Sequence, residues 1–218
     1  MALNITQTHS TAVLKGLSLD YPAIQLLDFD LPSYRKFING PCFLTKKLMI
    51  KYWLTYIFGH RDYFDIIYNG DHLTDATREK YMGYVSRDLL PEFIRKENYS
   101  STIPKRNVEY KNKAEVQKII EEKITNPMLA PLMASDEELA LLPPVYLLNP
   151  EYDGLRDEGF LLEARLRHAG VGVHHAYCPY EEHGFINFVD IDVNAEREIE
   201  KMSHFFNRQF GRDDDTLG

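Results

Sequence analysis

The chain has 218 residues, of which 44% are hydrophobic and 12% aromatic, a composition that supports a packed core rather than a disordered polymer. Its net charge of -8, without any basic run, argues against nucleic-acid binding, because phosphate contacts need clustered lysine and arginine. Two cysteines, Cys42 and Cys178, are too few for a disulfide framework and too far apart for a local zinc site.

The sequence shows neither a secretory signal nor a membrane span. The first ten residues, MALNITQTHS, lack both a charged segment and an apolar core. The most membrane-like stretch, LMIKYWLTYIF, contains Lys51 and falls short of the roughly 20 apolar residues that a spanning helix needs. Two sequons, at Asn4 and Asn98, permit N-glycosylation if the chain reaches the secretory lumen, although such triplets are common by chance.

The first predicted element is a strand over residues 13–24, which ends near Pro22 because proline cannot extend a ladder. From residue 44 to 142 the hydrophobic spacing is helical and predicts a helical insertion, interrupted by a polar, proline-rich surface loop. Thr45 is placed to cap the first of these helices. One face of that helix is expected to carry Leu48, Met49, Tyr52, Trp53, Tyr56 and Ile57.

Residues 143–210 change to an alternation of strands and helices. The short apolar run PPVYLLN is typical of a strand that is buried on both faces. This βαβα order predicts the α/β class, with parallel strands and flanking helices. The predicted elements are a strand over 143–149, a helix over about 156–168, a strand over 171–178 and a helix over about 194–209 that presents Ile199, Met202, Phe205 and Phe206.

Two residues of this unit are candidates for a site. In open parallel sheets ligand groups lie beyond the carboxyl ends of the strands, and Asp153 and His183 each follow a predicted strand. A carboxylate that orients an imidazole is the supporting half of a nucleophilic triad, because the acid fixes the tautomer and the imidazole removes the nucleophile's proton. Taken alone, an aspartate at a strand end is usually a turn or cap residue, and a loop histidine is often only a surface residue.

Other polar residues near these two have structural interpretations. Asp157 and Glu158 fall in the first turn of the predicted helix, where unpaired amides and the helix dipole favour negative charge, whereas Asp153 lies too early for that role. His174 and His175 are adjacent in a strand and point to opposite faces, so we expect one exposed and one packed ring and no shared metal site. We expect no cofactor.

The motif YDGLRDEG, followed by HGF, is specific, and it lies in a long run from MLAPLMAS to EEHGFINF. With YPAIQLLDFDLPSY and LTKKLMIKYW, this run resembles the carboxyl-terminal part of the arylacetamide deacetylase-like enzymes, in the hormone-sensitive-lipase type of α/β-hydrolases. The resemblance extends from about Val13 to Phe210. It implies that Asp153 is the triad acid and His183 the triad base, and it matches Asp157 to the acid beside the helix start.

The same resemblance implies a function and a location. Its members hydrolyse carboxylic esters and acetamides, so the implied partner is a small-molecule ester or amide that is lipid-like or xenobiotic. Many members are anchored at the endoplasmic reticulum, which implies the lumenal side of that membrane. In this family the insertion around Trp53 forms part of a lid over the acyl site, although an aromatic stripe is more often core or cap packing.

Two parts of the family's pattern have no counterpart in the sequence. The nucleophile elbow G-x-S-x-G and the oxyanion loop H-G-G-G do not occur, and the nearest match, GLSLD, has Asp20 in place of the second glycine and Ser18 inside a predicted strand. We therefore expect one partial α/β-hydrolase domain over residues 1–218 that begins after the elbow. Because an oxyanion hole alone commonly supplies about 100-fold in rate, we expect weak or no esterase activity from this chain alone.

Two functions from different classes remain open. The first is an ester hydrolase whose serine is supplied by sequence not present here. The second is a non-catalytic, truncated form that acts as a binding or interaction module. Half of a parallel sheet leaves an edge and apolar faces uncovered, so we also expect low solubility or self-association.

Overall fold

The computed structural model of the chain describes residues 14–38, 40, 42–99 and 103–212. Asn4, the first sequon, lies outside these residues. The elements are, in chain order, β1 (Leu17–Asp20), α2 (Pro32–Lys36), α3 (Lys46–Phe58), α4 (Phe64–Tyr68), α5 (Asp75–Tyr81), η1 (Met82–Val85), η2 (Arg87–Leu89), α6 (Glu92–Arg95), α7 (Lys113–Ile124), η3 (Pro131–Met133), α8 (Asp136–Leu139), β2 (Val145–Tyr152), α9 (Arg156–His168), β3 (Val173–Glu182), η4 (Phe185–Phe188) and α10 (Val193–Gln209), where η marks a 3-10 helix.

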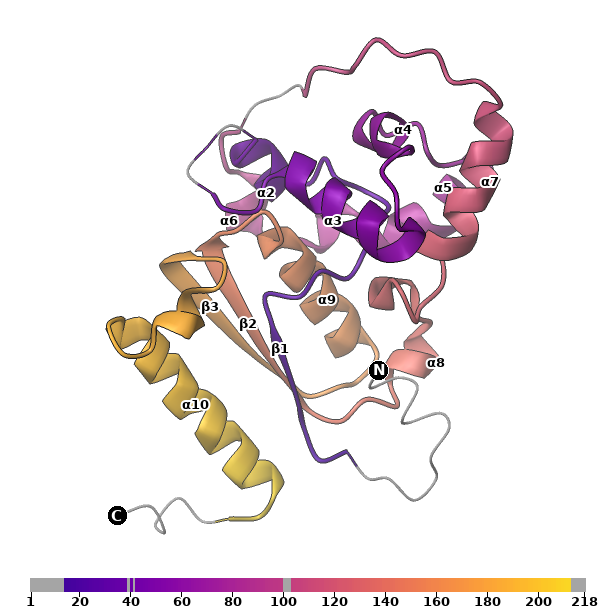
Figure 1. Cartoon of the computed structure of the whole chain (residues 1–218). Coiled ribbons are helices and arrows are strands. Elements are labelled where there is room, and N and C mark those ends of the chain that lie inside the picture. The colour runs from indigo at the N-terminus through magenta and orange to yellow at the C-terminus, as the bar shows by residue number, and fades with distance from the viewer. Residues whose placement is uncertain (1–13, 39, 41, 100–102, 213–218) are drawn as a thin grey trace.

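The described strands form a parallel sheet in the order β1-β2-β3. The register places Leu17 opposite Val145, and Val145 opposite Val173. Helix α9 covers one face of the sheet and α10 the other, while α2 and α6 lie beyond the carboxyl ends of the strands (Figure 1). The α/β class and the parallel strands with flanking helices agree with the prediction from the sequence.

The central strand β2 is buried on both faces, as its apolar run predicts. Val145 and Leu147 belong to the larger core cluster, which includes the apolar side chains of α9. Tyr146 and Leu148 point to the opposite face and pack with Phe205 of α10 in a smaller cluster. Each fully buried leucine of this kind contributes roughly 1.5–3 kcal/mol to folding relative to an exposed one, so burial on both faces makes β2 the centre of the fold.

Helix α9 approaches β2 closely because Gly159 has no side chain. A β-carbon at this position would lie 2.5 Å from Oδ1 of the buried Asn149. Asn149 in turn donates a hydrogen bond of 2.7 Å from Nδ2 to the carbonyl oxygen of Arg156, in the first turn of α9. The start of α9 is therefore fixed against the end of β2, where the candidate residues lie.

The strand boundaries differ from the prediction at β1 and at both ends of the other two strands, which begin at Val145 and Val173. Strand β1 covers only Leu17–Asp20 of the expected range 13–24, because Tyr21 turns the chain out of the sheet with a φ angle of 40°. Strands β2 and β3 continue to Tyr152 and Glu182, beyond the expected ends. The extension follows their mutual pairing, which runs as far as Tyr152 opposite Glu182.

The helices of the βαβα unit occupy the predicted positions. Helix α9 spans Arg156–His168, and α10 spans Val193–Gln209. Phe205 of α10 is buried, with Met202 and Phe206 packed beside it, but Ile199 is 39% exposed, so its expected place on the buried face was wrong. In the described residues, the side chains of α10 that pack in or against the smaller cluster include Phe205, Met202 and Phe206, and Ile199 is not among them.

Every regular element that the structure describes between residues 44 and 142 is helical. Thr45 caps α3 by accepting a hydrogen bond from the amide of Leu48, as expected. The buried face of α3 is rotated from the expected one. It consists of Met49, Ile50, Trp53 and Leu54, whereas Tyr52 and Tyr56 are exposed. Both faces of this helix are apolar enough that only the tertiary contact selects between them.

The two adjacent histidines of β3 differ in exposure, as expected. His174 is exposed and its ring stacks on Tyr146, with ring centroids 4.8 Å apart. The His175 side chain is 7% exposed, and its Nδ1 lies 2.5 Å from Oε2 of Glu163.

Among the helices of the described residues, none combines the length and the hydropathy that a membrane crossing requires.

Candidate active site

Asp153 and His183 meet at the carboxyl ends of β2 and β3. Each residue follows the last residue of its strand directly, and because the strands are parallel neighbours both side chains reach the same rim. Nδ1 of His183 lies 2.8 Å from Oδ2 of Asp153. With a carboxylate as acceptor, Nδ1 carries the hydrogen, so the lone pair of the imidazole is on Nε2.

The environments of the two side chains differ in a way that suits proton transfer. The Asp153 side chain is fully buried, whereas 23% of the His183 side chain is exposed. Among the described residues, Asp153 is the hydrogen-bond partner of the His183 ring, and that bond uses Nδ1. The ring is therefore oriented from the buried side, while Nε2 is free to receive a proton from a nucleophile.

Asp153 also organises the start of α9. Its Oδ1 accepts a hydrogen bond of 2.9 Å from the amide of Leu155, and its carbonyl oxygen accepts one of 3.1 Å from the amide of Arg156. Asp153 precedes the first turn of α9, as expected, and these bonds form the turn that leads into the helix. An aspartate readily bonds the amide two residues further on, so one oxygen serves the turn and the other serves His183.

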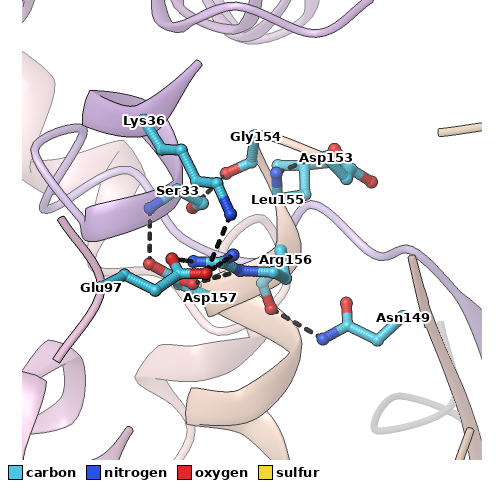
Figure 2. A network of polar contacts seen from close by, with 9 residues as sticks. All are labelled: Ser33, Lys36, Glu97, Asn149, Asp153, Gly154, Leu155, Arg156 and Asp157. Atoms are coloured by element: carbon cyan, nitrogen blue, oxygen red, sulfur yellow. Dashed lines mark hydrogen bonds and ion pairs between the residues drawn. The ribbon is translucent and has the colours of Figure 1, made fainter. Parts of the chain in front are cut away.

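The backbone beside Asp153 is clamped from the amino-terminal part of the chain. A β-carbon on Gly154 would overlap the carbonyl oxygen of Leu44, so the approach requires glycine. Ser33 in α2 donates a hydrogen bond of 2.7 Å from Oγ to the carbonyl oxygen of Gly154, and its amide donates one of 2.7 Å to Oδ2 of Asp157 (Figure 2). The loop that carries Asp153 is thus held on both sides.

Asp157 and Glu158 lie in the first turn of α9, as predicted, but they are fully buried and bind other segments. Glu158 accepts hydrogen bonds from the amide of Ile24 at 2.9 Å, from Nε2 of Gln25 at 3.0 Å and from the hydroxyl of Tyr34 at 2.7 Å. Burial raises the pKa of Glu158 to about 7, although these three hydrogen bonds act in the opposite direction. The two acids join the segment after β1 to α9.

Tyr21, which directly follows β1, places a third side chain at the carboxyl ends of the strands. The sequence did not indicate this residue. The ring of Tyr21 lies 4.5 Å from the ring of His183, centroid to centroid, at an angle of 54°. Burial raises the pKa of Tyr21 to about 12, with the charges of Asp20 and Asp153 adding to the effect. The positive φ angle of Tyr21, rare for a residue with a β-carbon, is the local feature that turns this ring toward the histidine.

Within the described residues, no serine, threonine or cysteine side chain is hydrogen-bonded to His183. Ser18 lies in β1, as predicted, and donates a hydrogen bond of 2.8 Å to Asp20. Burial raises the pKa of the Cys42 thiol to about 11, with the charge of Asp153 adding to the effect, and this keeps the thiol protonated. This part of the chain therefore holds an oriented base without an activated nucleophile beside it.

The sequence is similar to those of known hydrolases. The family model for the α/β hydrolase fold matches residues 92–187. Neutral cholesterol ester hydrolase 1 of Mus musculus is 34% identical over 185 residues, which are 83% of this chain and 43% of that protein. Arylacetamide deacetylase of Bos taurus is 34% identical over 178 residues, which are 81% of this chain and 42% of that protein. The chain spans a little under half the length of these relatives.

Solved structures of fungal esterases share the fold. An esterase from Rhizomucor miehei superposes with a TM-score of 0.58 and 18% identity, over 96% of this chain and 47% of that one. Carboxyl esterase 2 from Tuber melanosporum gives a TM-score of 0.57 and 20% identity, over 95% of this chain and 48% of that one. These structures share the fold, and the similarity in sequence shows that the chain belongs to the α/β-hydrolases, in the arylacetamide deacetylase-like group of the hormone-sensitive-lipase type.

Proposed function

We propose that Asp153 and His183 are the acid and the base of a serine-hydrolase triad that cleaves carboxylic esters or acetamides. The main support is the 2.8 Å contact between Nδ1 of His183 and Oδ2 of Asp153 at the carboxyl ends of neighbouring parallel strands. The serine is supplied by sequence outside these 218 residues. This chain alone is therefore expected to have weak or no activity.

In this mechanism Nε2 of His183 accepts the hydroxyl proton while the serine oxygen bonds to the carbonyl carbon of the substrate. The buried carboxylate of Asp153 stabilises the imidazolium that forms and keeps its ring oriented. The imidazolium then gives the proton to the departing alcohol or amine, which leaves an acyl-enzyme. His183 next removes a proton from water, the water oxygen bonds to the acyl carbon, and the imidazolium returns the proton to the serine oxygen as the carboxylic acid leaves.

The substrate we propose is a small ester or amide with an apolar acyl or alcohol part. Support comes from the names of the relatives, of which one is a cholesterol ester hydrolase and another an arylacetamide deacetylase.

We also propose the lumenal side of the endoplasmic reticulum as the location. Asn98, the sequon residue that the structure describes, is exposed. A mass shift on glycosidase treatment that disappears in Asn98→Gln would support this location, and an unmodified Asn98 in secretory-pathway expression would contradict it.

The decisive test is a chimera that joins the amino-terminal half of Bos taurus arylacetamide deacetylase to this chain at the start of β1. We expect the chimera to hydrolyse a short-chain p-nitrophenyl ester. Because the acid and base would both come from this chain, His183→Ala and Asp153→Ala should each lower kcat by about 1,000-fold or more. A folded chimera that remains as active in both variants would contradict the proposal.

The 218-residue chain alone provides a second, independent measurement. We expect no hydrolysis above that of its His183→Ala variant. Hydrolysis that disappears in this variant would reveal a nucleophile within the chain and would contradict the proposal that the serine lies elsewhere. A folded but inactive chimera would instead favour the non-catalytic alternative, a binding or interaction module.

A further inference from the structure

The first turn of α9 contains a buried cluster of ion pairs. The Arg156 side chain is fully buried, and its two terminal nitrogens donate hydrogen bonds of 3.0 and 2.8 Å to the two carboxylate oxygens of Glu97 (Figure 2). Its Nε donates a third bond, of 2.9 Å, to Oδ1 of Asp157. A forked guanidinium–carboxylate pair is among the strongest and most directional polar contacts in proteins, so it fixes the position of Arg156 closely.

Glu97 joins elements that are distant in the sequence. It lies just after α6, and Lys36 at the end of α2 donates a hydrogen bond of 2.9 Å to the same Oε1. Burial by itself would raise the pKa of Glu97, but the bonds from Arg156 and Lys36 outweigh it and lower the pKa. With Asp157, the cluster holds two cations and two anions, so removal of one member leaves a charge without its partner.

The main chain of Arg156 connects this cluster to the acid. Its amide closes the turn on the carbonyl oxygen of Asp153 at 3.1 Å. Its own carbonyl oxygen accepts the hydrogen bond from Asn149 at the end of β2. A change in the position of Arg156 therefore moves the turn that aims the Asp153 carboxylate at His183.

We propose that the Glu97–Arg156 ion pair is a positioning device that holds the Asp153 carboxylate in place for its hydrogen bond with His183. This inference rests on the proposed function, since the position of Asp153 matters to catalysis only if the two residues are the acid and base. Neither Glu97 nor Arg156 touches the imidazole, so both are positioning residues rather than catalytic ones. Their effect is expected in the state of the His183 ring, not in binding of the substrate.

A second ion pair on the same helix separates positioning from general stabilisation. Arg165, in the last turn of α9, donates a hydrogen bond of 2.6 Å to Asp136 and is 6% exposed in its side chain. This pair also joins α9 to another helix, α8, but it makes no contact with the turn at Asp153. If ion pairs on α9 only stabilise the fold, loss of either pair should have the same effect on His183.

The test measures the tautomer of His183 in the 15N-labelled 218-residue chain, at a pH where the ring is neutral. Long-range proton–nitrogen correlation spectra report whether Nδ1 or Nε2 carries the hydrogen, independently of ester hydrolysis, and His183→Ala assigns the signals. We expect the Nδ1–H form to dominate in the unmodified chain, because Asp153 accepts from Nδ1. The Asp153→Ala variant gives the ratio of the two tautomers for a His183 ring that lacks this hydrogen-bond partner.

Glu97→Gln is expected to move the ratio several-fold toward that of Asp153→Ala, and Arg156→Lys to give an intermediate value because lysine cannot form the fork. Asp136→Asn is the matched control. It should keep the tautomer ratio of the unmodified chain, even if it lowers the melting temperature as much as Glu97→Gln does. An unchanged tautomer ratio in Glu97→Gln would overturn the inference, and so would an equal change in Asp136→Asn. The inference would also fail if the unmodified chain had the same ratio as Asp153→Ala. If Glu97→Gln shifts the tautomer while Asp153→Ala leaves the chimera active, the positioning stands and the proposed function fails.

Discussion

At the scale of single residues, the start of α9 combines three acids that are fully buried. Asp153 and Asp157 each accept hydrogen bonds from nearby backbone amides. Glu158 is enclosed completely and has Asp153 as a neighbouring charge, and its burial raises its pKa to about 7. A carboxyl group of this kind favours the protonated state in the folded protein, so it makes stability depend on pH in a direction unusual for an acid.

The prediction for Glu158 follows from this direction. Its pKa is 4.5 in the unfolded chain and about 7 in the folded protein, so its contribution to stability is fully present below pH 4.5 and is lost as pH rises through 7. The loss is on the order of 3 kcal/mol. We expect Glu158→Gln to remove this dependence, measured as the difference between variant and parent in urea unfolding at pH 5 and pH 8. A difference that is the same at both pH values would contradict the raised pKa.

The sequence allowed part of the site to be predicted at this scale. Asp153 and His183 could be located because each follows a predicted strand, and parallel pairing then brings strand ends together. Tyr21 and Glu97 could not be found, because their partners lie far along the chain and no local pattern encodes such contacts. The hydrogen bond of Asp153 to the turn before α9 was also not predicted, since a single carboxylate can serve two partners at once.

At the scale of elements, the packing of α9 on β2 depends on Gly159. A methyl group there would lie 2.5 Å from Asn149, whose side chain is itself fixed by its bond to Arg156. We expect Gly159→Ala to lower the free energy of unfolding by about 1–3 kcal/mol, because the helix must move away from the strand. Gly83→Ala is the control, since a β-carbon at Gly83 meets nothing within 4 Å. Equal stabilities of the two variants in urea unfolding would show that α9 packs less tightly than described.

The elements themselves were predictable to different degrees. The limits of α9 and α10 follow from strong helical periodicity and clear end signals. The buried face of α3 did not follow, because Tyr52 and Tyr56 on one side and Ile50 and Leu54 on the other are all apolar. For such a helix the side that is buried depends on what surrounds it, and that information lies outside the segment.

At the scale of the whole molecule, both outer strands of the described sheet, β1 and β3, pair on one side only. Strand β1 pairs with β2 on one side only within the described residues, and beside it lies an apolar groove of about 200 Å³ lined in part by Leu17, Leu19 and Met128. An unpaired strand edge beside apolar surface favours association between chains. The purified 218-residue chain is therefore expected to self-associate.

Sedimentation velocity at several concentrations tests this expectation. Met128 lies at the groove and is 43% exposed, so Met128→Lys adds a charge there without burying it, and we expect it to weaken association several-fold. Ile191→Lys places the same charge at a residue that is 83% exposed and does not line the groove, and it should leave association unchanged. A monomeric parent chain would contradict the predicted self-association. Equal effects of the two variants would contradict a role for the groove beside β1.

The pairing of β1 with β2 has a consequence for the order in which the molecule assembles. β2, α9 and β3 are consecutive in the chain, whereas Leu17 must find Val145 across the whole helical insertion. Closing so long a loop is slow compared with forming the local βαβ unit, so we expect β1 to join the sheet late. Asp153 and His183 would then meet early, and the ring of Tyr21, carried at the end of β1, would reach His183 only in the last steps of folding.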